Sequence, residues 1–256
     1  MRTAGSRDTR PMVSYGQYCP VARAAEILGD RWTLLIVREM VGGVSGFNQL
    51  GRCLPGISRS VLAQRMRALE RAGVVERRTS GGGRTLGYRL TAAGRDLRGV
   101  LEATGNWGAT WALGDPLPGE LDPSLLVFWM ARHVEPERLP LGRTVVELKF
   151  RAPKRRLWLV LEREEVSVCM QHTGFDVDLI VGADSCALYD VYFGRTTLAE
   201  AVRSGAVTLE GPSRLTRAFG GWFSWSAYAR ALREAPARRQ GAQHMTVHDL
   251  PVSIVG

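Results

Sequence analysis

Apolar and polar residues alternate with helical spacing in the stretch that follows residue 57. Leu62, Met66 and Leu69 recur every three or four positions and predict one buried stripe along a helix. Ser58 stands where this helix would begin and is a good N-cap. The opposite face of the helix would be exposed to solvent and would carry Ser60, Gln64, Arg67 and Arg71.

A strand, turn, strand pattern comes directly after this helix. Gly73 ends the helix, and two strand-forming segments, residues 74–79 and 85–90, flank a Ser-Gly-Gly-Gly turn. Arg84 stands at the tip of the turn, and no carboxylate accompanies it. The pattern predicts a helix joined to a two-stranded ribbon with a basic tip.

Three shorter helices are predicted ahead of this pair. Pro20, at a first helical position, starts a helix over residues 21–28. Asp30 is expected to cap a second, strongly apolar helix over residues 31–40. A short third helix is expected over residues 47–54. Three helices, an exposed helix and a ribbon make up a winged helix-turn-helix module.

A long helix is predicted after the ribbon, capped by Thr91 and ending near residue 113. One face of this helix, which the small preceding module cannot easily cover, carries Leu97, Leu101, Thr104 and Trp111. Two interpretations are open. The face is a seam between two copies of the chain, or it packs against the domain that follows.

Three prolines and two glycines between residues 114 and 123 cannot continue a helix and mark a domain boundary. Beyond it the pattern changes to a mixture of helices and strands. Helices are expected over residues 125–133, 185–193, 197–204 and 213–232, the last interrupted at Gly220-Gly221. Strands, the first three of them successive and antiparallel, are expected over residues 144–151, 157–161, 166–171, 177–181 and 206–210.

The fold class is therefore α+β, with an N-terminal winged helix-turn-helix domain and a C-terminal domain in which helices flank an antiparallel sheet. The predicted organisation is a flexible arm at 1–14, a first domain at 15–114, a linker at 115–123, a second domain at 124–234 and a flexible tail at 235–256.

The charge distribution supports a polyanion as partner of the first domain. The chain carries a formal charge of +9. Residues 1–115 hold 17 Arg or Lys against 9 Asp or Glu, a net charge of +8, and the rest of the chain is nearly neutral. Because summed positive potential concentrates phosphate, an excess confined to the half with the helix and ribbon indicates nucleic-acid binding.

The cysteines and apolar runs define the expected compartment. Four cysteines stand far apart, show no CxxC spacing and form no finger-type pair with histidine, so no metal site is expected. The sequence shows no signal peptide and no apolar run of transmembrane length. We expect a cytoplasmic, nucleoid-associated protein with no membrane partner and no cofactor.

Residues 15–113 resemble the HxlR-type family of bacterial winged-helix regulators. The resemblance rests on ordered strings at compatible spacing, namely Cys19-Pro20-Val21, Leu28-Gly29-Asp30-Arg31-Trp32-Thr33-Leu34-Leu35-Ile36, Leu54-Pro55-Gly56-Ile57-Ser58, Leu62 to Glu70, Gly73-Val74-Val75-Glu76-Arg77 and Tyr88 to Gly94. It implies a homodimeric transcription factor that uses its first and last helices as the seam, here residues 21–28 and 92–113.

Residues 124–233 are similar, more faintly, to the lipid-carrier domains of the sterol carrier protein type 2 class. The similarity lies in the order of helix, antiparallel strands, short helices, strand and final helix. Such domains enclose an apolar tunnel, and the resemblance therefore implies a hydrophobic small molecule or lipid as ligand. No sharp motif defines the tunnel, and a filled core is the ordinary alternative. The apolar candidates to line it are Phe128, Trp129, Trp158, Tyr192, Phe193, Phe219, Trp222 and Phe223.

Contacts to base edges specify a DNA sequence, and contacts to phosphates position the protein. Ser60, Gln64 and Arg67 are the candidates for base edges, since Arg pairs with guanine and Gln with adenine. Arg84 is the candidate for a phosphate or the minor groove. The full set of candidate DNA-binding residues is Ser58, Arg59, Ser60, Gln64, Arg65, Arg67, Arg77 and Arg84.

Cys19 offers a different regulatory chemistry. It lies just ahead of a helix whose N-terminal dipole would favour a thiolate, and thiolate character controls reactivity. Some HxlR-type regulators sense oxidants or quinones through a cysteine at this place. The resemblance therefore implies that Cys19 is a redox or electrophile sensor. A cysteine that only packs or caps is the alternative.

An enzymatic function has little support. The sequence contains no Gly-x-Ser-x-Gly elbow, no phosphate-binding loop and no zinc-hydrolase motif. Asp176 and Asp178 alternate on a predicted strand, but no base or metal ligand accompanies them. We predict a dimeric repressor that binds an inverted-repeat operator on double-stranded DNA, with an apolar effector in the second domain. The alternative is regulation through Cys19, with a second domain that is only structural or binds a protein.

Overall fold

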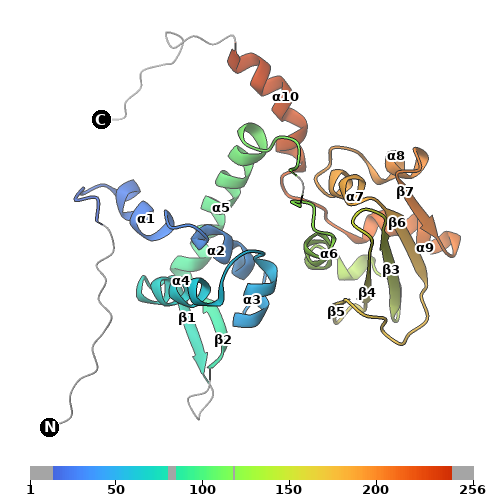
Figure 1. Cartoon of the computed structure of the whole chain (residues 1–256), viewed down its shortest axis with the longest axis horizontal. Helices are drawn as coiled ribbons and strands as arrows, with labels where there is room; N and C mark the ends of the chain where they lie inside the picture. Colours follow the sequence, from blue (N-terminus) through green and yellow to red (C-terminus); the bar gives the residue numbers. More distant parts are fainter. Residues whose placement is uncertain (1–13, 80–84, 118, 244–256) are drawn as a thin grey trace. The chain divides into compact units, whose positions relative to one another are not determined.

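The structure is a computed structural model that describes residues 14–79, 85–117 and 119–243 (Figure 1). The chain divides into two compact units, Met1–Glu102 and Ala103–Gly256. Most of the predicted arm, the predicted wing tip with Arg84, and the end of the predicted tail lie outside the described residues. No helix of the described part is long and apolar enough to cross a membrane.

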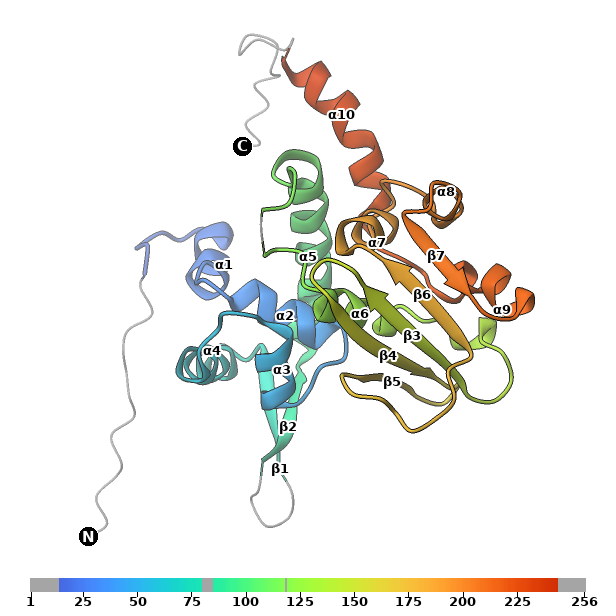
Figure 2. The ribbon, with the colours of Figure 1, turned by 45° about the vertical axis from the view of Figure 1, so that its right-hand side comes forward.

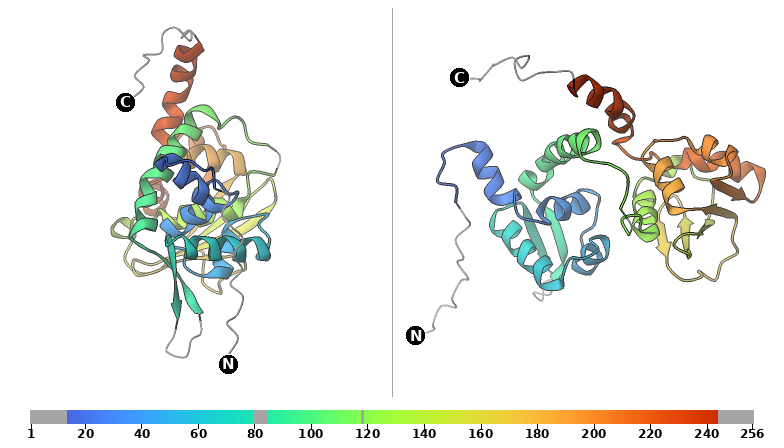
Figure 3. Two further views of the ribbon diagram at one scale, coloured as in Figure 1. Left: turned by 90° about the vertical axis from the view of Figure 1, so that its left-hand side faces the viewer. Right: turned by 45° about the horizontal axis from the view of Figure 1, so that its top comes forward.

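The first unit has the predicted order of elements. It contains α1 (Pro20–Leu28), α2 (Thr33–Val41), α3 (Phe47–Cys53), α4 (Arg59–Arg71), β1 (Val75–Thr79), β2 (Thr85–Leu90) and the start of α5 (Ala92–Trp111). Strands β1 and β2 pair antiparallel and extend as a ribbon away from the helices (Figures 1 and 3). The winged helix-turn-helix prediction is confirmed.

Apolar side chains from α2, α3, α4 and the ribbon form the core of the first unit. Ile36, Val37 and Leu50 are completely buried and contact the apolar stripe of α4. Leu97 and Leu101 of α5 pack against the same core. The expectation that the first unit cannot cover these two residues is therefore wrong, because α5 lies close against the core that its own domain builds.

The start of α5 is fastened to the turn that follows α4. The Thr91 hydroxyl accepts a hydrogen bond from the Gly94 amide at 3.1 Å, as the cap prediction requires, and donates to the Gly73 carbonyl at 2.6 Å. The Thr91 amide donates to the Val74 carbonyl at 3.1 Å. One side chain thus caps the helix and fixes where it begins relative to the ribbon.

The prediction that Asp30 caps the second helix is wrong. Helix α2 begins at Thr33, and its N-cap is Trp32, whose φ of 79° lies in the left-handed region. The Asp30 carboxylate instead forms an ion pair with Arg65 of α4. A cationic partner is a stronger hydrogen-bond donor than a backbone amide, so the carboxylate takes the tertiary contact.

The second unit is an α+β domain, as predicted. Its elements are α6 (Pro123–Arg132), the short helix η1 (Pro136–Arg138), β3 (Thr144–Phe150), β4 (Arg155–Leu161), β5 (Val166–Cys169), β6 (Leu179–Ala183), α7 (Ser185–Tyr192), α8 (Leu198–Arg203), β7 (Val207–Glu210), α9 (Ser213–Ala218), η2 (Phe219–Trp222) and α10 (Ala229–Gln243). Asp122 caps α6 by accepting a hydrogen bond from the Ser124 amide at 2.8 Å.

The five strands form one sheet in the order β5-β4-β3-β6-β7. The first three strands are successive and antiparallel, as predicted, and the only parallel neighbours among the described strands are β3 and β6. Asp178 anchors this parallel pair, since its carboxylate accepts a hydrogen bond from the Val145 amide at 2.8 Å. Its role here is structural.

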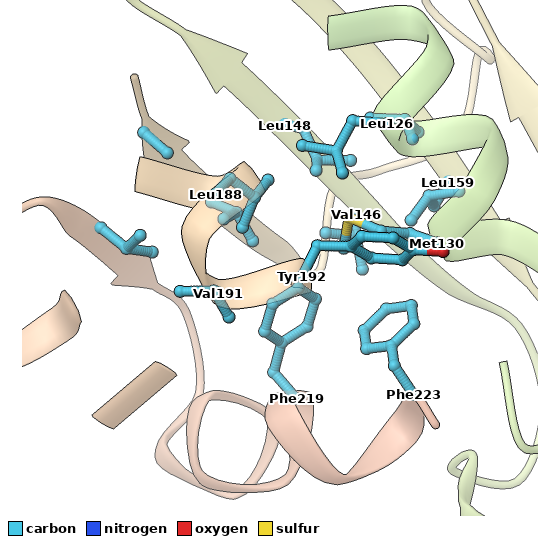
Figure 4. Close-up of a cluster of buried hydrophobic side chains, with 14 of the residues drawn as sticks. Leu126, Met130, Val146, Leu148, Leu159, Leu188, Val191, Tyr192, Phe219 and Phe223 are labelled. Carbon is cyan, nitrogen blue, oxygen red and sulfur yellow. The ribbon is translucent and has the colours of Figure 1, made fainter. Parts of the chain in front are cut away.

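One face of the sheet and the helices beside it enclose the core of the second unit (Figures 2 and 4). Leu126 and Met130 of α6 and Leu188 of α7 are completely buried there. They meet Val146 and Leu148 of β3, as Figure 4 shows. Val146, Leu148 and Phe150 of β3 all belong to this core, because every second side chain of a strand points to the same face.

The predicted flexible tail begins too early. Helix α10 continues to Gln243, with Pro236 inside it, and Leu232 and Ala235 are buried. Arg239 donates hydrogen bonds to the carbonyls of Thr110 at 2.5 Å and Leu113 at 3.1 Å. These carbonyls lie at the end of α5, where a cation is favourable, and the contact keeps α10 ordered.

The division between the units falls within α5, after Glu102, whereas the predicted boundary is the segment 115–123. Residues 112–122, apart from residue 118, contain no helix or strand, as the three prolines predict. The last part of α5 belongs with the second unit because α10 of that unit holds its carbonyls.

Candidate nucleic-acid interface

Helix α4 has one buried and one polar face. Leu62, Met66 and Leu69 are each 1% exposed, which confirms the predicted stripe. The Ser58 hydroxyl accepts a hydrogen bond from the Val61 amide at 3.2 Å and is 3.0 Å from the hydroxyl of Ser60. The exposed side chains on the other face are Ser60, Gln64, Arg67 and Arg71.

Arg67 and Arg71 are the cations of this face. Among the described residues, neither takes part in an ion pair or a side-chain hydrogen bond. A helix that offers hydroxyl, amide and guanidinium groups on one exposed side fits the chemistry of base edges and phosphates in a major groove. The predicted site omits Arg71, although its spacing from Arg67 already places it on the exposed face.

The predicted residues at the start of α4 have structural contacts as well. Ser58 is the cap, as described. Arg59 donates a hydrogen bond to the Asn48 side chain at 3.3 Å, and its guanidinium lies 5.4 Å from the centre of the Phe47 ring. These contacts hold Arg59 against α3 and leave it exposed at the first turn of α4.

Arg65 does not lie free on the exposed face. Its side chain is only 19% exposed and forms the ion pair with Asp30. The buried guanidinium joins α4 to the turn before α2, so its structural task is clear. Of the predicted DNA-binding residues in α4, Arg65 has the least support from the geometry.

The arginines of the ribbon differ in their partners. Arg77 donates to Glu70 of α4 at 3.0 Å and lies 5.8 Å from the centre of the Tyr88 ring. Arg89 is paired with Glu76 across the ribbon at 2.7 Å. Arg77 therefore reaches DNA only if its ion pair, which is partly exposed, rearranges.

Cys19 lies at the N-cap of α1, half-buried, and its side chain makes no cap hydrogen bond. None of the four cysteines, all of which lie in the described residues, forms a disulfide bond. The position agrees with the one on which the sensor prediction depends, and that prediction stays untested. Among the described residues, no group of three or more His, Cys, Asp or Glu is placed to hold a metal ion.

The aromatic side chains predicted to line a tunnel contact one another in the core of the second unit. Tyr192, Phe219, Trp222 and Phe223 are buried members of this core, and Trp129 and Phe193 pack against it. The ring centres of Phe219 and Phe223 are 5.2 Å apart, and those of Tyr192 and Phe193 are 5.3 Å apart. Figure 4 shows Tyr192, Phe219 and Phe223 converging.

Trp158 is separate from this group. It is buried on β4 opposite Glu147 in the strand register, and its ring lies 5.7 Å from that of His172. Phe128 is partly buried on α6. The sequence shows which residues are apolar, but it does not show that the sheet separates Trp158 from the other rings.

Comparison with known proteins agrees with this geometry. Residues 27–115 match the family model described as HxlR-like helix-turn-helix. An uncharacterised HTH-type transcriptional regulator of Mycobacterium tuberculosis is 46% identical over 89 residues, which are 34% of this chain and 56% of that protein. The match thus spans just over half the length of that relative.

Two further similarities are a relative that is matched over almost its whole length and a solved structure. The uncharacterised HTH-type transcriptional regulator YvaP of Bacillus subtilis is 31% identical over 116 residues, which are 44% of this chain and 99% of that protein. The solved structure of UbiJ-SCP2, a ubiquinone synthesis protein, covers 49% of this chain and 91% of its own at 22% identity, with a TM-score of 0.29. The sterol-carrier-like second domain stays a prediction.

Proposed function

Because this chain belongs to the HxlR-like helix-turn-helix family of DNA-binding transcriptional regulators, we propose that it binds an inverted-repeat operator as a homodimer through α4. The observation that carries the proposal is the exposed face of α4, where Ser60, Gln64 and Arg67 stand opposite a fully buried apolar stripe. In helix-turn-helix proteins the recognition helix lies in the major groove, and residues of its N-terminal part contact base edges.

Within this proposal the residues of α4 have separate tasks. Arg67 donates two hydrogen bonds to guanine, Gln64 pairs with adenine, and Ser60 contacts a base or a phosphate at the first turn. Arg59, beside them, contacts a phosphate. Arg84 supplies the wing-tip contact, although it lies outside the described residues.

The dimer uses the exposed apolar side of α5. Val100 is 42% exposed, Trp107 62% and Trp111 44%, and their spacing places them on one side of the helix. Val21 of α1 is 77% exposed. Burying large apolar side chains against a second copy removes them from water, which is the main driving force for association. Two recognition helices then lie about 34–36 Å apart, one turn of DNA.

DNA binding by α4 is tested with Arg67→Ala and a matched control, Arg214→Ala, an exposed arginine of α9. Fluorescence anisotropy with a duplex from the gene's own upstream region, recorded at several salt concentrations, compares the two variants. We expect Arg67→Ala to lower affinity and relax sequence preference, and Arg214→Ala to bind as wild type. Equal losses from both substitutions would show that α4 does not read DNA.

The dimer is tested by sedimentation of Trp107→Glu beside Leu141→Glu, an apolar residue of the second unit that is 84% exposed. A charge at the seam is expected to give monomers, and the same charge at Leu141 to leave the dimer intact. Monomers from wild type at the same concentration would contradict the proposal.

Regulation through the second domain has two candidates. The first is an apolar effector, which would have to bind one arrangement of the dimer better than another. If the protein is a repressor, such an effector induces transcription by lowering the affinity for the operator. The close ring contacts around Phe219 and Tyr192 favour instead a filled core that serves structure or protein binding, with Cys19 as a sensor. Mass spectrometry of organic extracts of the purified protein separates them, since a co-purifying lipid supports the first and its absence supports the second.

A further inference from the structure

A cavity of about 490 Å³, open to solvent on one side, lies in the first unit. It is bordered by the end of α2 and the turn after it, by the ribbon and by the first turns of α5, and none of its lining residues comes from α4. The turn is fixed against β2, because the Ser45 carbonyl accepts a hydrogen bond from the Tyr88 amide at 2.8 Å. A Cβ at Gly87 would lie 2.9 Å from the same carbonyl oxygen, so glycine allows this close approach. The volume is in the range of small-molecule sites, and backbone contacts hold its wall in place.

This ribbon cavity combines an apolar surface with a cationic rim. Met40 and Val44 contribute apolar surface. No Asp or Glu is among the described residues that line the cavity. Its rim carries Arg78, Arg89, Arg95 and Arg98.

Two of these arginines retain all of their hydrogen-bonding capacity. Arg89 is paired with Glu76, and Arg95 donates to the Leu90 carbonyl at 3.0 Å. Within the described part of the chain, the side chains of Arg78 and Arg98 take part in no ion pair and no hydrogen bond. Each guanidinium offers five donors in a planar fork that matches a carboxylate or a phosphate. Arg95 also lies near the positive end of α5, where an anion is favourable and another cation is not.

The rim is separate from the face that reads DNA. Side chains alternate along a strand, so Arg78 lies on the side of β1 opposite to Arg77. Arg77 is held by Glu70 of α4 and therefore marks the side of the ribbon that faces the recognition helix. Arg89 pairs with Glu76, a neighbour of Arg77 in sequence, and shares the far side with Arg78. The site formed by these arginines is thus distinct from the face of α4 that is proposed to bind DNA.

We propose that the ribbon cavity binds a small amphipathic organic anion, with its apolar body against Met40 and Val44 and its acidic group between Arg78 and Arg98. An occupant of this kind joins the ribbon to α5. It therefore couples the position of the wing to that of the helix that carries the dimer seam. Coupling to DNA rests on the proposed function, whereas the binding of the anion does not.

The test is isothermal titration calorimetry of the full chain, without DNA, with three probes of one shape. Naphthoate carries a carboxylate, naphthyl phosphate carries a phosphate, and naphthamide carries no charge. Inorganic phosphate is the fourth arm and lacks the apolar body. The variants are Arg98→Gln and a matched control, Arg71→Gln, an exposed arginine of α4 with the same change of charge.

We expect one naphthoate or naphthyl phosphate per chain, and the stronger of the two identifies the acidic group that the site prefers. Arg98→Gln should weaken binding by about tenfold to a hundredfold, because it removes a charge-assisted hydrogen bond. Arg71→Gln should bind as wild type. Equal binding of naphthamide, or no effect of Arg98→Gln on the charged probes, would overturn the proposal. So would a loss of DNA affinity in Arg98→Gln without any anion binding, which would assign this rim to DNA phosphates instead.

Discussion

Two glycines of α5 provide a matched test of how this helix docks on the first unit. A Cβ at Gly94 would meet the Val74 carbonyl oxygen far inside van der Waals contact, and would lie 3.0 Å from Cδ2 of Leu90. A Cβ at Gly99, further along the same helix, would have no neighbour within 4 Å. Alanine at both positions therefore changes helix propensity equally but changes packing only at Gly94.

The expected magnitudes follow from this difference. Gly99→Ala should stabilise the first unit by about 1 kcal/mol, the difference in helix propensity between glycine and alanine. Gly94→Ala gains the same contribution, but overpacking costs about 1–3 kcal/mol. It also displaces the Val74 carbonyl, which accepts a hydrogen bond worth about 1 kcal/mol from the Thr91 amide. We expect a net loss of about 1–3 kcal/mol for Gly94→Ala.

Native-state hydrogen exchange followed by mass spectrometry measures this locally. The slowest amides of α4 report the free energy of unfolding of the first unit, and those of β3 serve as an internal reference in the second unit. Protection of α4 should fall in Gly94→Ala and rise slightly in Gly99→Ala, with β3 unchanged. If the two variants protected α4 equally, α5 would not dock on residues 73–74 as described.

Three further expectations concern packing, acid stability and DNA. Leu62→Ala should destabilise the first unit by about 2–5 kcal/mol in the same exchange experiment, whereas the exposed Gln64→Ala should change it by less than about 0.5 kcal/mol. Hydrogen bonds from Thr197 and Thr196 lower the pKa of Glu200 below its ordinary value of 4.5. The stability that these bonds add is fully present above pH 4.5 and is lost as pH falls through the lowered pKa. The temperature of thermal unfolding should therefore fall less in acid for Glu200→Gln than for wild type. Arg59→Ala, which removes a proposed phosphate contact, should reduce the slope of log affinity against log salt by about 1, which a titration of anisotropy against salt measures.

The recognition helix and the ribbon could be predicted from sequence because their signals are local. The stripe of Leu62, Met66 and Leu69 has a helical period, and Ser58 caps the helix through a contact three residues away. The exposure of Gln64 and Arg67 follows from the same period. Family resemblance added that the exposed face would belong to a DNA reader.

What could not be predicted depends on contacts between residues far apart in the chain. Asp30 is a good cap by its residue type, but Arg65 competes for its carboxylate once α4 is in place. Apolar spacing identifies β6 as a strand but carries no information on its direction relative to β3. The order of α10 depends on Arg239 reaching the end of α5, which nothing near Pro236 indicates.

The positive charge of the first unit divides into groups with different tasks once each arginine is considered with its partner. Arg65, Arg77 and Arg89 face carboxylates, so much of their charge is neutralised within the fold. Within the described residues, the arginines without such partners include Arg67 and Arg71 on α4 and, at the ribbon cavity, Arg78 of β1 and Arg98 of α5. Net charge counts all of these arginines alike. An arginine without an internal partner can bind a polyanion directly, whereas a paired arginine must first break its ion pair. The net charge of +8 for residues 1–115 therefore overstates the cationic surface of α4. It also does not show that the rim of the ribbon cavity is a second cationic surface, because the two are distinguished only by what each arginine contacts.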